Sequence, residues 1–148
     1  MRVGDVCTRP VIQCATDTSA LEIAQLMRTS HIGAVIVVDR SNGEHVAAGI
    51  VTDRDLVVQV MAEDADATRI TAGELIRSPL ITAADGDDVN DTLELMAFNG
   101  VRRIPVVNEY GTPVGIVTFD DLLKLTAGQL AALGKVIDRE RFEEDQAR

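Results

Sequence analysis

Two copies of one residue pattern divide the chain, and this internal repeat constrains the fold more than any other feature. Gly4–Ile12 aligns with Gly73–Ile81 at an offset of 73 − 4 = 69, and Gly, Pro and Ile recur in place. Gly49–Leu56 aligns with Gly115–Leu122 at an offset of 115 − 49 = 66, with six of eight positions identical. The offset changes within residues 40–45, where turn residues cluster and insertions are tolerated. The chain therefore consists of two similar units.

Each copy predicts the element order β-α-β-β-α. The expected elements of the first copy are strands at 11–14, 35–38 and 48–52, a helix after the polar cluster 16–19, and a helix at 53–61. Those of the second are strands at 80–82, 104–107 and 114–118, a helix after 85–88, and a helix at 120–125. Ala20, Ile23, Ala24 and Met27 have the spacing of one helical face. A half of about 65 residues buries little surface alone, so we expect an α/β (α+β) fold whose halves pack together.

The repeat also sets the expected domain boundaries. These are a first repeat at 1–62, an acidic connector at 63–71, a second repeat at 72–126, and a C-terminal helix with a charged tail at 127–148. Leu130, Leu133 and Ile137 share one helical face. That face covers an edge of the domain or forms a dimer contact, and both alternatives are open at this point.

Charge and composition exclude several classes of protein. With 14 basic and 24 acidic residues the formal charge is −10, which disfavours general nucleic-acid binding. The longest apolar run, Ile32 to Val38, is far short of the roughly 20 residues of a membrane-spanning helix. The N-terminus has no apolar stretch of signal-peptide length. We therefore expect a soluble protein of the cytoplasm.

The motif Gly-Ile-Val-Thr-x-x-Asp ends a strand and opens a helix in both copies, and it predicts a binding site. Thr52 with Asp55, and Thr118 with Asp121, lie at helix N-termini, where free N–H groups suit a phosphate or a sugar oxygen. A carboxylate one turn into the helix can accept hydrogen bonds from the two hydroxyls of a ribose. The alternative is that Thr and Asp only cap the helix.

Arg102 and Arg103 precede a strand of the second copy. Two adjacent arginines in an acidic protein suit a polyphosphate, although a surface pair that offsets local acids is the alternative. The first copy has Gly33 and Ala34 at these positions. We therefore expect two unequal sites, of which the one around Asp121 is the better equipped.

Catalysis and metal binding are disfavoured. The chain lacks the nucleophile elbow, the His-Glu-x-x-His zinc motif and the phosphate-binding P-loop. Cys7 and Cys14 are expected to be small buried residues. A metal or redox site that combines them with His31 or His45 lacks a recognised ligand spacing and is the weaker alternative. We expect no enzyme activity and no metal.

Taken together, these motifs resemble the cystathionine-β-synthase-type (CBS) domain, and two in tandem are similar to a Bateman module. The resemblance covers Val3 to Leu125. It is carried by the two Thr-x-x-Asp strand ends, by Ile32–Asp39 and by Val101–Val107. It implies two repeats packed with pseudo-two-fold symmetry, two clefts between them, and a regulatory rather than a catalytic role.

The resemblance also implies an adenosine ligand such as AMP, ADP, ATP or S-adenosylmethionine, with no obligatory cofactor. Asp121 and Asp55 would hold the ribose hydroxyls, and Thr118 and Thr52 would contact the ribose or first phosphate. Arg102 and Arg103 would meet the phosphates of the second site. The remaining implied residues are Ile104 and Pro105 beside the adenine and, more loosely, Thr16.

The family implies dimerisation as well. The expected dimer is a disc formed through helices that include Leu26-Met27 and Leu95-Met96. No effector domain is recognised in the sequence, so a signal would pass to a separate partner protein. The alternatives are a partner-binding dimer that takes no nucleotide and, less favoured, the metal or redox responder.

Overall fold

The computed structural model describes all 148 residues and contains two three-stranded sheets, one from each repeat. The first sheet has the order β1-β2-β3 and the second the order β4-β5-β6. In each sheet the first two strands are parallel and the last two antiparallel. Both antiparallel pairs shift register at the same place, between Val37 and Val38 and between Val106 and Val107. The fold is therefore a duplicated unit, as the sequence predicts, and the register shift of the antiparallel pair is duplicated with it.

The first repeat has the predicted element order. Its elements are β1 (Gln13–Ala15), α2 (Ala20–Ser30), β2 (Ala34–Asp39), β3 (Val46–Thr52), α3 (Asp53–Leu56) and the π-helix η1 (Val57–Met61). Ser19 caps α2 and forms a capping box with Glu22, which confirms the predicted polar start of this helix. The helix expected over residues 53–61 is present, but its second half is wound as a π-helix, which the sequence did not indicate.

The second repeat follows the same order with one correction. Its elements are β4 (Ala83–Ala84), α5 (Val89–Asn99), β5 (Arg103–Val107), β6 (Pro113–Thr118) and α6 (Phe119–Gln146). The strand expected at 80–82 is wrong, because β4 is a two-residue strand at 83–84. Leu80 and Ile81 instead line a cavity between the repeats.

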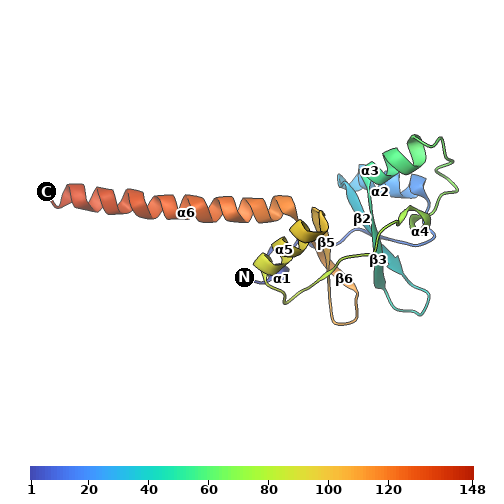
Figure 1. Ribbon diagram of the computed structural model, residues 1–148, viewed down its shortest axis with the longest axis horizontal. Coiled ribbons are helices and arrows are strands. Elements are labelled where there is room, and N and C mark those ends of the chain that lie inside the picture. The colour runs from blue at the N-terminus through green and yellow to red at the C-terminus, as the bar shows by residue number, and fades with distance from the viewer.

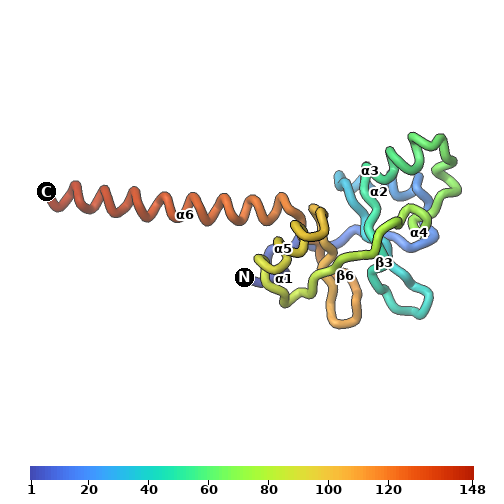
Figure 2. Tube along the Cα trace, in the orientation of Figure 1, coloured from blue at the N-terminus to red at the C-terminus, as the bar shows by residue number.

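The core of each repeat includes a short helix from the segment that precedes the strands of the other repeat. The helix α1 (Val3–Val6) places Val3 in the core of the second repeat, and α4 (Ala72–Leu75) places Ala72 and Leu75 in the core of the first. Figures 1 and 2 show α1 beside α5 and α4 beside the first sheet. The two repeats are thus linked by exchanged segments, and neither core is complete without the other half.

The glycines of the two Gly-Ile-Val-Thr motifs make room for these exchanged segments. A Cβ on Gly49 would lie 2.4 Å from Ile76 Cδ1, and a Cβ on Gly115 would lie 2.5 Å from Cys7 Sγ. Ile76 and Cys7 are equivalent positions of the repeat. The motif glycine therefore serves close packing between the halves.

The last helix is longer than expected. The sequence predicted a helix at 120–125 and a separate C-terminal helix with a charged tail within 127–148, but α6 runs unbroken for 28 residues and projects away from both sheets (Figure 1). Leu130 and Leu133 are 65% and 63% exposed. The alternative in which this segment covers an edge of the domain is therefore wrong for this structure.

Candidate functional site

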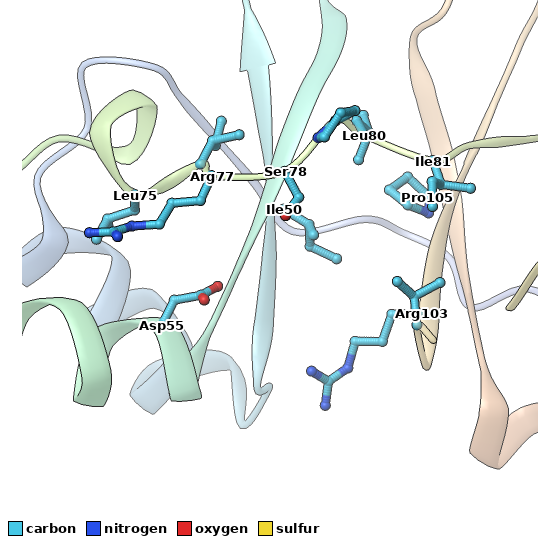
Figure 3. A pocket seen from close by; sticks show the side chains of 12 residues that line it. Ile50, Asp55, Leu75, Arg77, Ser78, Leu80, Ile81, Arg103 and Pro105 are labelled. Carbon is cyan, nitrogen blue, oxygen red and sulfur yellow. The ribbon is translucent and has the colours of Figure 1, made fainter. Parts of the chain in front are cut away.

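A cavity of about 190 Å³ lies between the two repeats and takes its walls from both. Asp55 enters from the start of α3, and Arg103 from β5 of the other repeat (Figure 3). The segment between α4 and β4 closes one side. The complete lining is Ile50, Asp55, Leu75, Ile76, Arg77, Ser78, Pro79, Leu80, Ile81, Val101, Arg103 and Pro105. The cavity thus combines an apolar wall with one carboxylate, two guanidinium groups and a hydroxyl.

Asp55 is held rigidly by the capping box that opens α3. Its Oδ2 accepts hydrogen bonds from the Thr52 backbone N–H at 2.8 Å and from the Thr52 hydroxyl at 3.0 Å. Its Oδ1 has only a long contact of 3.4 Å with Gln59 Nε2. One oxygen therefore fixes the carboxylate, while the other is available to a ligand hydroxyl.

Thr118 and Asp121 form the equivalent box at the start of α6. Asp121 Oδ2 accepts from the Thr118 N–H at 3.1 Å and from its hydroxyl at 2.7 Å. Both boxes cap helices, so the capping role considered for these residues is shown for each pair. Thr118 and Asp121 are not among the residues that line the cavity.

Arg103 reaches across the boundary between the repeats. A Cβ on Gly33 would lie 3.6 Å from Arg103 Nη2 and 3.1 Å from Asp53 Oδ2, so Gly33 leaves space for both side chains. The sequence analysis grouped Arg103 with Asp121 and regarded Gly33 as the lack of a basic residue. The structure groups them differently, since Arg103 supplies a positive charge to the cavity that contains Asp55.

Arg102 lies apart from Arg103. Its Nη2 is 3.3 Å from Asp120 Oδ1, and its guanidinium lies 4.9 Å from the centre of the Phe119 ring. The side chain is 72% exposed. Arg102 lies just before β5, where side chains alternate between the two faces of the sheet, and Arg103, the first strand residue, is the one on the face that lines the cavity.

The same alternation separates Ile104 from Pro105. Pro105 lines the cavity, whereas Ile104 is buried in the core of the second repeat. Thr16 lies outside the cavity lining, and its carbonyl accepts a 2.9 Å hydrogen bond from the N–H of Gly73. Of the nine residues that the sequence singled out, the cavity therefore brings together Asp55, Arg103 and Pro105.

Three polar residues of the site, Arg77, Ser78 and Gln59, were not predicted from the sequence. Arg77 lines the cavity, and its Nε donates to Gln59 Oε1 at 2.6 Å. Gln59, on the π-helix, also donates from Nε2 to the Leu75 carbonyl at 3.2 Å. Gln59 therefore lies between Arg77, which it contacts through Oε1, and Asp55, which it contacts through Nε2. The repeat alignment contained a signal for Arg77, because it aligned Gly73–Ile81 as a motif.

The pseudo-equivalent positions around Asp121 carry different side chains. The offsets of 69 and 66 place Ala34 where the other half has Arg103, Thr8 where it has Arg77, and Leu125 where it has Gln59. The one arginine of that segment, Arg9, hydrogen-bonds to Asp85, and this bond raises the pKa of Arg9. The two clefts therefore differ in the positive charge that they offer a ligand.

Metal-binding side chains are not gathered in this structure. No three His, Cys, Asp or Glu side chains lie where one metal ion could bind them together. Cys7 and Cys14 are both free, and burial raises the pKa of the Cys14 thiol. None of the helices combines the length and the apolar character that a membrane crossing requires.

Comparison with known proteins identifies the repeated unit. The model of the CBS domain matches residues 3–62 and again residues 72–128. Hypoxic response protein 1 of Mycobacterium tuberculosis is 36% identical over 101 residues, which are 68% of each chain. The crystal structure of Hypoxic Response Protein I with two coordinated zinc ions has a TM-score of 0.73 and 29% identity, and covers 84% of this chain and 98% of that chain.

Two further solved structures are complexes with adenosine compounds. The CBS domain pair of protein MJ0100 with 5-methylthioadenosine and S-adenosyl-L-methionine has a TM-score of 0.73 and 27% identity, over 87% of this chain and 98% of its own. The AMP complex of PAE2072 from Pyrobaculum aerophilum has a TM-score of 0.73 and 25% identity, over 86% of this chain and 99% of its own. Proteins similar to this chain thus bind adenosine ligands.

Proposed function

The chain belongs to the CBS domain family, and we propose that it is a regulatory module that binds AMP, ADP or ATP in the cavity between its two repeats. The observation that carries the proposal is the meeting of Asp55 from one repeat with Arg103 from the other in one cavity. A ligand that touches both repeats favours one arrangement of them over another, by the difference in its affinity for the two. Such a ligand therefore acts as a signal.

Each part of an adenine nucleotide has a counterpart in the cavity. The apolar wall, which includes Ile50 and Pro105, suits the faces of an adenine ring. Asp55 Oδ1 suits the ribose hydroxyls, since its other oxygen is held by Thr52. Arg77 and Arg103 suit a phosphate. The volume of about 190 Å³ is small for a ligand site, which favours AMP over the larger nucleotides.

A binding role agrees with the chemistry of the lining better than catalysis does. The cavity is lined by no His or Cys, and its single hydroxyl is that of Ser78. Both cysteines are free thiols, which suits a reducing compartment such as the cytoplasm. We propose that the signal passes to a separate effector protein.

We also propose that the module acts as a homodimer. Met27 and Met96 are buried in the cores of their own repeats, so other side chains of the helices would have to supply the contact. Other apolar side chains on the helices are exposed, including Val57, Met61 and Phe98, the last at 90%. These exposed groups also suit a partner protein, and a partner-binding dimer that takes no nucleotide is the second candidate.

The test is isothermal titration of the purified protein with AMP, ADP, ATP and S-adenosylmethionine. We expect AMP to bind, and we expect Asp55→Asn to abolish most of the affinity because ribose loses its charged acceptor. Asp121→Asn is the matched control, since it makes the same change in the equivalent capping box outside the cavity. Binding lost in Asp121→Asn and kept in Asp55→Asn would place the ligand in the other cleft. Binding of none of the four compounds would favour the partner-binding dimer.

A further inference from the structure

The outer part of α6 presents an apolar seam to solvent. Leu123, Leu130, Leu133 and Ile137 are each more than half exposed, and with Thr126 they follow the alternating three- and four-residue spacing of a coiled coil. In heptad letters, Leu123, Leu130 and Ile137 are at position a, and Thr126 and Leu133 at position d. Figure 1 shows most of α6 extending away from both sheets, so the chain itself leaves these exposed side chains uncovered.

A lone helix of this composition needs a covering partner. Gly128 and Gly134 lie in its interior, and glycine lowers helix stability relative to alanine. Most of the stability of protein helices comes from packing of an apolar face. A Cβ added at Gly128 or Gly134 would meet no atom within 4 Å, so close packing inside the chain does not explain either glycine.

The charge pattern favours a second copy of this chain as that partner. The whole chain carries −10, so two copies repel each other over most of their surface. Residues 122–137 contain only two charged side chains, Lys124 and Lys135, and neither is at a, d, e or g. The seam is therefore the segment along which two acidic chains approach with little repulsion at the contact.

The positions beside the seam favour a parallel, in-register pair. In that arrangement each g residue faces the e residue five positions later on the partner. Val136 then packs on the aliphatic stem of Arg141 of the second copy. Glu140 and Glu144 continue the a and d series with carboxylates, so the apolar pairing ends after Ile137.

We propose that residues 123–137 of α6 pair with the same residues of a second copy as a parallel two-stranded coiled coil. The pairing joins two modules at their α6 helices and is independent of nucleotide binding. Its surface is distinct from the exposed side chains of η1 and α5 described above.

The first test is oxidative cross-linking of the full chain carrying Leu133→Cys, with Phe142→Cys as the matched control. Phe142 is exposed like Leu133, at 56% and 63%, but its heptad position f faces away from the seam. We expect a disulfide-linked dimer from Leu133→Cys and not from Phe142→Cys or the unaltered chain. Equal cross-linking of the two variants, or none in either, would overturn the proposal.

The second test is hydrogen exchange of the α6 amides in the full chain. We expect protection of residues 129–137 in the unaltered protein and in Phe142→Glu, and loss of most of it in the double variant Leu130→Glu, Leu133→Glu. Protection that survives in the double variant would overturn the proposal, as would rapid exchange in the unaltered protein at every concentration. The affinity of the same variants for AMP is expected to be unchanged. The coiled-coil proposal and the nucleotide-binding proposal are therefore tested independently.

Discussion

Asp55 and Asp121 lie in the same kind of capping box and have different surroundings. In both, a threonine N-cap holds one carboxylate oxygen through two hydrogen bonds. Only the Asp55 cleft adds Arg103, Arg77 and Gln59, since the equivalent positions are Ala34, Thr8 and Leu125. Duplication has therefore kept the part that stabilises a helix, while the charged part differs between the halves. The comparison separates a structural role from a binding role at equivalent residues.

The largest effect is expected at the motif glycines. Gly49→Ala and Gly115→Ala are each expected to lower the free energy of unfolding by about 1–3 kcal/mol, because the new methyl overlaps Ile76 or Cys7. Urea unfolding measures both, with Gly86→Ala as the control, since a Cβ there meets no atom within 4 Å. Only Gly49→Ala is expected to weaken AMP binding as well, because Ile76 lines the cavity. Equal loss of AMP affinity in both variants would contradict the difference between the clefts.

Arginine variants are expected to give the next largest effect. Arg103→Ala should raise the Kd for AMP by about tenfold to a hundredfold, since a hydrogen bond to a charged group contributes roughly 1.5–3 kcal/mol. Arg102→Ala removes the same charge from the adjacent residue, which contacts Asp120 and Phe119 rather than the cavity. The Kd of Arg102→Ala for AMP should stay within about twofold of the unaltered value, because solvent screens an exposed charge that does not contact the ligand. A larger rise in Kd for Arg102→Ala than for Arg103→Ala would contradict the placement of the ligand beside Arg103 and favour the site around Asp121 that was inferred from the sequence.

Gln59→Leu makes the first repeat resemble the second at this position. We expect a loss of AMP affinity of about threefold to tenfold, because Arg77 loses a 2.6 Å hydrogen bond that positions it. The control is Gln25→Leu, which makes the same change on α2, away from the cavity. If Gln59→Leu binds AMP as the unaltered protein does, Arg77 needs no such positioning and the π-helix has no part in the site.

The smallest effect concerns the helix caps in acid. Hydrogen bonds from the backbone N–H and the hydroxyl of Ser19 lower the pKa of Glu22, and a bond from the Asn90 N–H together with one from the N-terminal amine lowers the pKa of Asp88. A carboxyl whose pKa falls on folding adds stability above its unfolded pKa, and this stability is lost as pH falls through the folded pKa. Urea unfolding between pH 7 and pH 3 should therefore show declining stability below about pH 4. Glu22→Gln should decline less over this range because it removes the titrating carboxyl, and an equal decline would exclude Glu22 as a contributor.

Much of the fold was predictable because it depends on local pattern. The Ser19 and Asp88 caps, the apolar spacing of α2 and the β-branched strands are short-range features. The repeat adds support, because equivalent helices in the two copies start at equivalent polar clusters. The strand expected at 80–82 was not found, because an apolar run such as Leu80-Ile81 is equally suited to a strand and to the wall of a cavity. The unbroken α6 was missed because the end of the second repeat at residue 126 was taken as the end of its last helix, whereas the helix continues to Gln146.

The site was less predictable, and Arg103 shows why. Its neighbours in the chain pointed to Asp121, but the direction of a side chain on a strand alternates, and the pseudo-symmetric packing decides which cleft that side chain enters. Gly33 was interpreted from the sequence as the lack of a basic residue, but in the structure its missing side chain leaves room for Arg103 to reach the first repeat.

The sequence by itself determined the duplication, the order of elements and the two Thr-x-x-Asp caps, because these depend on residues close together in the chain. Only the tertiary structure decided that α1 and α4 complete the opposite cores, that Asp55 meets Arg103 and Arg77, and that the seam of α6 lies in solvent. These relationships join residues far apart in the chain, and their geometry depends on how the two halves pack rather than on the pattern within either half.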